Sequence, residues 1–268
     1  MVFFAYSCSK EERNPGDEDW SFVVFGDVQQ GFGVYSMLAQ NIGNLLPAPQ
    51  CAFCCGDIML RPANEVEWVN FWKVSEPITD KMKLYITRGN HEGNDPASER
   101  VLKEQLQLPQ DHFYYSFARR NAMFIILDTE IAGEENSIGP EQFQWLNQAL
   151  LAAGQASDVD HVFIFMHRPL FPQGQHSGSP LANRLELHDL FLEYPKIRAV
   201  FAGHEHMFNK YQRDGINYII TGGGGGVLYD GYGGNYHHFT KVSFYEESNR
   251  INIKTIGIFN ETVEDFDL

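Results

Sequence analysis

The stretch FVVFGDVQ at residues 22–29 is an apolar run that ends in a glycine followed by the polar side chains Asp27 and Gln29. Four further apolar runs end in the same way, in GD at 56–57, GNHE at 89–92, H at 167 and GHEH at 203–206. Short apolar runs are typical of buried parallel strands, whose carboxyl ends meet at one edge of a sheet. We therefore expect these polar groups to converge, although they lie far apart in the sequence.

The rest of the chain alternates such runs with longer amphipathic segments, which is the pattern of βαβ units and indicates an α/β fold. The predicted strands are Phe22–Phe25, Ala52–Cys55, Lys83–Thr87, Tyr114–Phe117, Met123–Leu127, His161–Met166, Arg198–Ala202, Asn217–Thr221, Lys241–Tyr245 and Ile251–Gly257. Apolar residues at helical spacing predict helices within Tyr35–Leu46, Val66–Val74, Val101–Leu108, Leu185–Tyr194 and after Pro140. Late in the chain, strands follow one another without helices, which predicts an antiparallel or mixed second sheet that closes the fold.

Composition excludes several classes of protein. Of the 268 residues, 43% are hydrophobic and 21% charged, which is typical of globular proteins and not of disordered or coiled-coil chains. The net charge of −15 would repel the phosphate backbone of a nucleic acid, so we expect no nucleic-acid partner. No apolar run reaches the about 18 residues needed to cross a bilayer, so we expect no transmembrane segment.

The four cysteines fall into two groups. Cys51, Cys54 and Cys55 lie in an apolar run and are predicted to be small core residues, with a Cys-x-x-Cys zinc or redox pair as the rival interpretation. Cys8 follows a short apolar stretch that resembles the end of a bacterial lipoprotein signal, although seven residues are too few for a complete signal. We expect a tail at residues 1–18, which is either lipid-anchored at Cys8 or simply frayed, and one domain at 19–268. The corresponding localisations are the bacterial cell envelope and, as the alternative, the cytoplasm.

Three further features have no settled interpretation at this point. The five glycines at 222–226 lack the Lys-Ser/Thr ending of a phosphate-binding P-loop. Either a tight turn or the floor of a pocket explains a backbone that must pass close to other atoms. Glu92 and Glu205 lie inside the polar motifs, but the sequence indicates no role for either.

The ordered set Asp-x-Gln, Gly-Asp, Gly-Asn-His-Glu, His and Gly-His-x-His resembles the calcineurin-like metallophosphoesterase superfamily, from about Ser21 to Ile258. The segments at 113–117 and 167–171 resemble the branch that includes purple acid phosphatases and their bacterial relatives. The resemblance implies a four-layer α/β/β/α sandwich of two mixed sheets that holds two metal ions.

Carried over position by position, the resemblance makes Asp57 the carboxylate that bridges both metal ions. The remaining ligands form two sets, one of Asp27, Gln29 and His206 and the other of Asn90, His167 and His204. Independently of the family, imidazole combined with carboxylate and amide groups favours iron, zinc or manganese over calcium. Two such divalent or trivalent ions lower the pKa of a shared water molecule, so the expected nucleophile is metal-bound water or hydroxide.

His91 matches the non-ligand histidine of the family's Asn-His pair, so we expect it to stabilise charge and protonate the leaving alkoxide. The chain also departs from the family. Gln29 stands where the family usually has histidine, and an amide is the weaker ligand. Leu60 replaces the aspartate that orients the catalytic histidine in many phosphatases and the metal-ligating tyrosine of purple acid phosphatases. We therefore expect no purple colour, and His91 must have another orienting partner or do without one.

Three residues are candidates for binding the substrate. Arg61 matches the arginine that grips phosphate in the protein-phosphatase branch, with a surface salt bridge as the alternative. Residues 168–181 are rich in Gly, Pro and Ser and directly follow a proposed ligand. They form either a lid, whose Arg168 or His176 touches the phosphate, or a long surface loop.

The expected function is that of a hydrolase acting on phosphoric ester bonds. Specifically, we expect a dinuclear metal-dependent phosphoesterase whose partner is a small phosphomonoester or phosphodiester substrate. One alternative is a catalytically degenerate metal-binding module of the cell envelope. A nuclease is a further alternative, which the negative charge disfavours.

Overall fold

The computed structural model describes residues 17–29, 31–108 and 112–268. Its strands are β1 (Trp20–Phe25), β2 (Cys51–Cys54), β3 (Lys83–Ile86), β4 (Tyr115–Arg119), β5 (Ala122–Ile126), β6 (His161–Phe165), β7 (Ile197–Ala202), β8 (Phe208–Arg213), β9 (Ile216–Thr221), β10 (His238–Tyr245), β11 (Arg250–Gly257) and β12 (Thr262–Asp267). They form two six-stranded sheets, in the orders β12-β11-β10-β1-β2-β3 and β4-β5-β6-β7-β9-β8.

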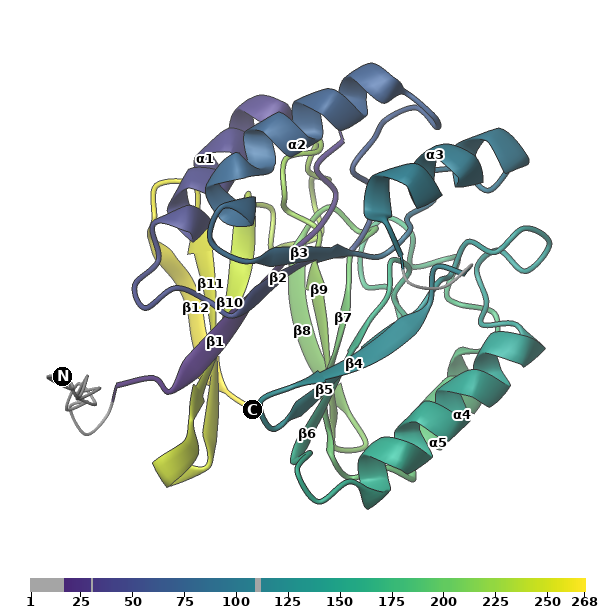
Figure 1. Cartoon of the computed structure of the whole chain (residues 1–268), viewed down its shortest axis with the longest axis vertical. Coiled ribbons are helices and arrows are strands. Elements are labelled where there is room, and N and C mark those ends of the chain that lie inside the picture. Colours follow the sequence, from purple (N-terminus) through teal and green to yellow (C-terminus); the bar gives the residue numbers. More distant parts are fainter. Residues whose placement is uncertain (1–16, 30, 109–111) are drawn as a thin grey trace, which may run out of the picture.

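Helices cover the outer faces of the two sheets, as Figure 1 shows. The helices are α1 (Phe32–Gly43), α2 (Glu65–Thr79), α3 (Pro96–Leu106), α4 (Pro140–Gln155) and α5 (Arg184–Leu192), with a 3-10 turn at Glu246–Ser248. Buried apolar side chains form three clusters: between α1–α3 and the first sheet, between the two sheets, and between the second sheet and α4 and α5. The prediction of a four-layer α/β/β/α sandwich is therefore confirmed.

Strand β1 explains why the predicted strand Phe22–Phe25 is apolar at every position. Val23 and Phe25 belong to the cluster beneath the helices, whereas Phe22 and Val24 belong to the cluster between the sheets. Successive side chains of a strand point to opposite faces, so a strand covered on both sides needs apolar residues throughout. The strand then ends where the chain turns into the polar loop that begins at Gly26.

The second sheet is mixed, as expected, but the C-terminal strands are shared between the two sheets and do not all belong to it. β10 pairs antiparallel with β1 and extends the first sheet through β11 and β12. β8 and β9 form an antiparallel hairpin that completes the second sheet. The apolar pattern does not reveal β8 and β12, because both are edge strands with several charged and exposed residues.

Cys51, Cys54 and Cys55 are buried and unpaired, which confirms their interpretation as core residues. Burial raises the pKa of the Cys51 thiol to about 12, so this thiol is inert at neutral pH. Cys8 lies outside the described residues, so its lipid anchor stays a prediction. Among the described residues, no helix combines the length and apolar character needed to cross a membrane.

Phe53 is the residue whose truncation should weaken the interface between the sheets most clearly. Its ring is 1% exposed, stacks on Phe165 at a centroid distance of 3.9 Å and lies 5.0 Å from the Phe124 ring. Phe53→Ala should lower the free energy of unfolding by about 3–5 kcal/mol, because it leaves a cavity between two packed sheets. Urea denaturation measures this change. Phe259→Ala, at a side chain that is 79% exposed, should change it by less than about 0.5 kcal/mol, and equal effects of the two variants would contradict the assignment.

Candidate metal centre

Five loops at the carboxyl ends of strands bring the predicted ligands together. The loops follow β1, β2 and β3 in the first sheet and β6 and β7 in the second, and these strands are parallel within each sheet. All seven side chains predicted as ligands converge, and each has an atom within 3.5 Å of another member of the set. The convergence expected from the strand-end motifs is therefore present in the fold.

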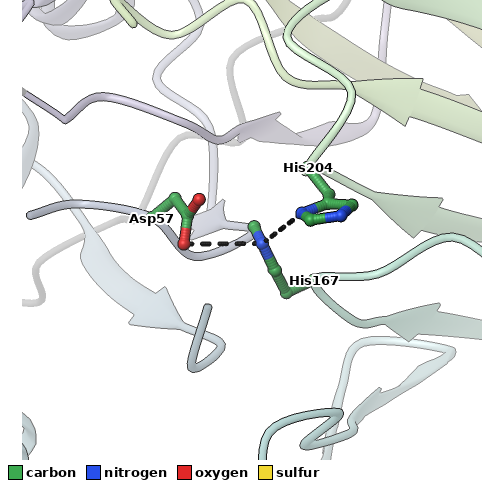
Figure 2. A group of neighbouring side chains, drawn as sticks. All are labelled: Asp57, His167 and His204. Carbon is green, nitrogen blue, oxygen red and sulfur yellow. Dashed lines mark hydrogen bonds and ion pairs between the residues drawn. The ribbon is translucent and has the colours of Figure 1, made fainter. Parts of the chain in front are cut away.

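His167 lies at the centre of one half of this set, between Asp57 and His204 (Figure 2). Its Nε2 lies 3.4 Å from Asp57 Oδ1, 3.1 Å from His204 Nδ1 and 2.9 Å from Asn90 Oδ1. Its Nδ1–H donates to the Cys55 carbonyl oxygen at 2.8 Å, because that oxygen can only accept. With Nδ1 held by this carbonyl, Nε2 faces the oxygens of Asp57 and Asn90.

The second half of the set is built around Asp27, Asp57 and His206. His206 Nε2 lies 3.5 Å from Asp27 Oδ1 and 3.3 Å from Gln29 Nε2. The Gln29 amide also donates to Asp57 Oδ2 at 3.4 Å. His206 Nδ1–H donates to the Val227 carbonyl oxygen at 2.6 Å, which leaves Nε2 directed at the site. Ligation through the Gln29 oxygen requires the amide to turn over, since its nitrogen faces the other ligands here.

The donor set fits metal ions, and Asp57 belongs to both groups of side chains able to hold one. Burial, together with the negative charge of Asp57, holds the pKa of Asp27 well above its usual value. Burial also lowers the pKa of His204 and of His206. A cation bound among these groups would offset the repulsion between the buried carboxylates and accept the lone pairs of the unprotonated imidazoles. The donor set therefore favours cation binding.

The backbone at this site is held in unusual conformations. Five of the predicted ligands have positive φ angles in the left-handed region, namely Asp27 (61°), Gln29 (43°), Asp57 (54°), His204 (71°) and His206 (40°). For residues other than glycine this conformation costs about 1–3 kcal/mol each. Such strain persists only where surrounding contacts fix it, so the loops hold these side chains at the expense of local stability.

The glycine run at 222–226 lies directly against the loop that carries Asp27. Gly224 N–H donates to the Gly26 carbonyl oxygen at 2.8 Å, and Gly226 N–H donates to the Asp27 carbonyl oxygen at 2.7 Å. A Cβ atom at Gly222 would lie 2.7 Å from Asp27 Oδ2. Only glycine allows the two backbones to approach this closely.

Glu92, for which the sequence indicated no role, ties two loops of the site together. One carboxylate oxygen accepts the N–H groups of Asp57 at 2.9 Å and Gly89 at 2.7 Å. The other oxygen accepts those of Ile58 at 2.8 Å and Met59 at 3.1 Å. The side chain is buried and crosses from the loop after β3 to the loop after β2. No spacing rule reveals it, because its partners are backbone groups of a remote loop.

His91 is oriented by the backbone of residue 60 and not by its side chain. Its Nδ1–H donates to the Leu60 carbonyl oxygen at 2.9 Å, and its backbone N–H donates to Asp57 Oδ1 at 2.9 Å. Nε2 lies 3.9 Å from Asp57 Oδ2, and the side chain is 32% exposed. His91 therefore borders the ligand set with one ring nitrogen fixed and the other directed toward it.

The two candidate arginines differ in their placement. Arg61 is exposed and makes no ion pair or side-chain hydrogen bond with any residue that the structure describes. Arg168 donates from Nε and Nη2 to the carboxylate of Glu130, at 2.6 and 3.1 Å, and its Nη1 donates to His204 Nε2 at 3.2 Å. Arg168 thus lies against a predicted ligand with its guanidinium held in a bidentate pair, whereas Arg61 does not join the set.

His176 lies over the predicted ligands. Its ring stacks on His204 with centroids 4.1 Å apart, and the Tyr229 ring meets it edge-on at 5.5 Å. Tyr229 also stacks on His206 at 4.5 Å with the ring planes 7° apart. Burial, with the charges of Asp27 and Asp57, raises the pKa of Tyr229 to about 12. Tyr229 belongs to no motif, and nothing in the sequence pattern distinguished it.

The chain also matches a family model and several known proteins. The family model described as calcineurin-like phosphoesterase matches residues 21–208. Purple acid phosphatase 23 of Arabidopsis thaliana is 27% identical over 224 residues, which are 80% of this chain and 46% of that protein. Serine/threonine-protein phosphatase CPPED1 of Danio rerio is 26% identical over 226 residues, 79% of this chain and 70% of that protein. The chain therefore spans less than half the length of the first of these relatives.

Two solved structures share the fold. The purple acid phosphatase PPD1 from yellow lupin superposes with a TM-score of 0.77 at 18% identity, over 95% of this chain and 54% of that one. A dimetal phosphatase from Danio rerio superposes with a TM-score of 0.66 at 16% identity, over 94% of this chain and 99% of that one. Because the family model covers most of the chain, including all seven predicted ligands, the chain belongs to the calcineurin-like phosphoesterase family.

Proposed function

We propose that this protein is a dinuclear metal-dependent phosphoesterase that hydrolyses small phosphomonoesters or phosphodiesters with water as the nucleophile. The observation that carries the proposal is the position of Asp57, whose carboxylate belongs to both candidate metal-binding groups. A carboxylate with one oxygen toward each group is the arrangement that a bridged pair of ions needs. The nitrogen and oxygen donors, without a thiolate among them, favour iron, zinc or manganese.

The residues around the predicted ligands have separate roles in the proposed reaction. Bound ions would supply positive charge for the phosphate and an acidified water molecule. His91, fixed through Nδ1 by the Leu60 carbonyl, would hold a proton on Nε2 for the departing oxygen. Arg168, anchored by Glu130, has further N–H groups to offer a phosphate oxygen. His176 borders the same space through its stacking on His204.

Replacing the shared carboxylate tests the metal centre directly. Asp57→Asn should reduce the bound metal to less than one ion per chain and abolish hydrolysis of p-nitrophenyl phosphate, because the amide lacks the charge that holds two cations. Metal analysis and a steady-state assay after loading with Mn²⁺, Fe²⁺ or Zn²⁺ measure both. Asp189→Asn, at an exposed position of α5, serves as the matched control and should change neither. A metal-loaded wild type without hydrolysis would contradict the proposal and favour a metal-binding module.

Gln29 should make one of the two ions easier to remove. Gln29→His introduces an imidazole, which is a stronger ligand than an amide. Removing the ion bound at this position should therefore require about 10-fold more of a competing chelator. Chelator titration followed by metal analysis measures the retention. Retention unchanged from the wild type would argue that Gln29 is not a ligand.

The role of His91 is tested by comparing leaving groups. An alkoxide needs protonation far more than p-nitrophenolate does, so His91→Ala should lower kcat for an alkyl phosphate by about 100-fold and affect the aryl ester much less. The ratio of the two kcat values, measured with unchanged metal content, is the readout. His112→Ala should preserve that ratio, since His112 stacks on Tyr114 and contacts no predicted ligand. An equal loss for both esters would exclude His91 as the proton donor.

A further inference from the structure

Glu205 holds the loop that carries His176 against the candidate metal centre. Its side chain is fully buried. In the sequence it lies between two predicted ligands, His204 and His206. Glu205 accepts the backbone N–H of His176 at 3.3 Å from Oε2, together with backbone N–H groups of Gly174 and Gln175. Three consecutive N–H groups on one carboxylate form a concave anion-binding turn. The loop at 174–176 is thus held by hydrogen bonds to the carboxyl group of Glu205 and not merely packed.

Glycine at position 174 is required for this docking. A Cβ atom there would collide with Glu205 Oε2 and lie 2.8 Å from Met207 Sδ. Any larger residue would push the loop away from the carboxylate. Gly174 and Glu205 therefore act as a pair that sets how closely the loop approaches the site.

The second oxygen of Glu205 faces the His176 ring without completing a hydrogen bond. Oε1 and His176 Nδ1 lie 3.9 Å apart, and neither atom has a hydrogen-bond partner among the described residues, although both are buried. An unpaired buried carboxylate oxygen is unfavourable. The two atoms are complementary when Nδ1 carries the proton, and a shift of about 1 Å would join them at hydrogen-bond distance.

We propose that Glu205 is a positioning residue, which fixes His176 by accepting Nδ1–H so that Nε2 is presented to the phosphate group of the substrate. This inference rests on the proposed function. The stacked His204 ring and the Tyr229 edge limit the His176 ring on its two other sides. The carboxylate then selects which nitrogen carries the proton, as partners of imidazoles do in many enzyme sites. His176 touches the substrate, and Glu205 acts through it.

Glu205→Gln separates this role from a purely structural one. The amide oxygen still accepts the N–H groups of residues 174–176, whereas its NH₂ group faces Nδ1 and reverses that hydrogen bond. The variant should keep its metal content and its melting temperature within a few degrees. It should raise KM for p-nitrophenyl phosphate by about 10-fold with a smaller change in kcat. Glu186→Gln, at an exposed position of α5, should leave both constants unchanged.

A double-mutant cycle with His176→Ala provides the decisive comparison. Because Glu205 acts through His176, Glu205→Gln should have no further effect on KM in the His176→Ala background. Effects that multiply, or a Glu205→Gln variant with the wild-type KM, would overturn the inference. An inactive metal-loaded wild type would instead refute the proposed function, so the two failures are distinguishable. Gly174→Ala should raise KM in the same way, through the collision with Glu205, and a wild-type KM there would also count against the inference.

Discussion

Three buried carboxylates hold the loops of this site together by accepting backbone N–H groups. Both oxygens of Asp27 receive the His204 N–H, at 2.9 and 3.0 Å, which joins the loop after β1 to the loop after β7 and so joins the two sheets. Asp57 receives the His91 N–H, and Glu92 receives four N–H groups from two loops. These hydrogen bonds stabilise the left-handed backbone conformations in the loops that follow the strands. The convergence of the predicted ligands depends on them.

The same carboxylates oppose folding, because burying negative charges close together is unfavourable. The raised pKa of Asp27 expresses that repulsion, since burial and the charge of Asp57 are its two largest causes. Backbone hydrogen bonds offset part of the penalty, and bound cations would offset more. Backbone strain in the predicted ligands is a further unfavourable contribution to the free energy of folding. Metal binding and stability should therefore be linked, because a ligand that binds only the folded state stabilises it.

The sequence predicted those features that repeat along the chain. Each apolar run followed by a polar motif marked a strand end, and the parallel arrangement placed these ends together. It did not predict Glu92, Glu205 or Tyr229, since their partners are remote backbone atoms or ring faces that leave no spacing in the sequence. The apolar pattern did not reveal edge strands such as β12, because solvent on one side removes the need for continuous apolar residues. Arg61 and Arg168 looked alike as candidates, and only the fold placed Glu130 where it anchors Arg168.

The two departures from the family pattern, at positions 60 and 29, differ in their chemical consequences. At position 60 the family side chain is lost, but the histidine it would orient is held by a backbone carbonyl, which any residue at that position supplies. Leucine there changes the charge beside His91 without releasing the ring. At position 29 the proposed ligand atom belongs to the side chain itself, and the amide of Gln29 faces its neighbours through nitrogen. Sequence identity at a motif is thus a poor measure of functional loss, since what matters is whether the replaced group acted through its side chain alone.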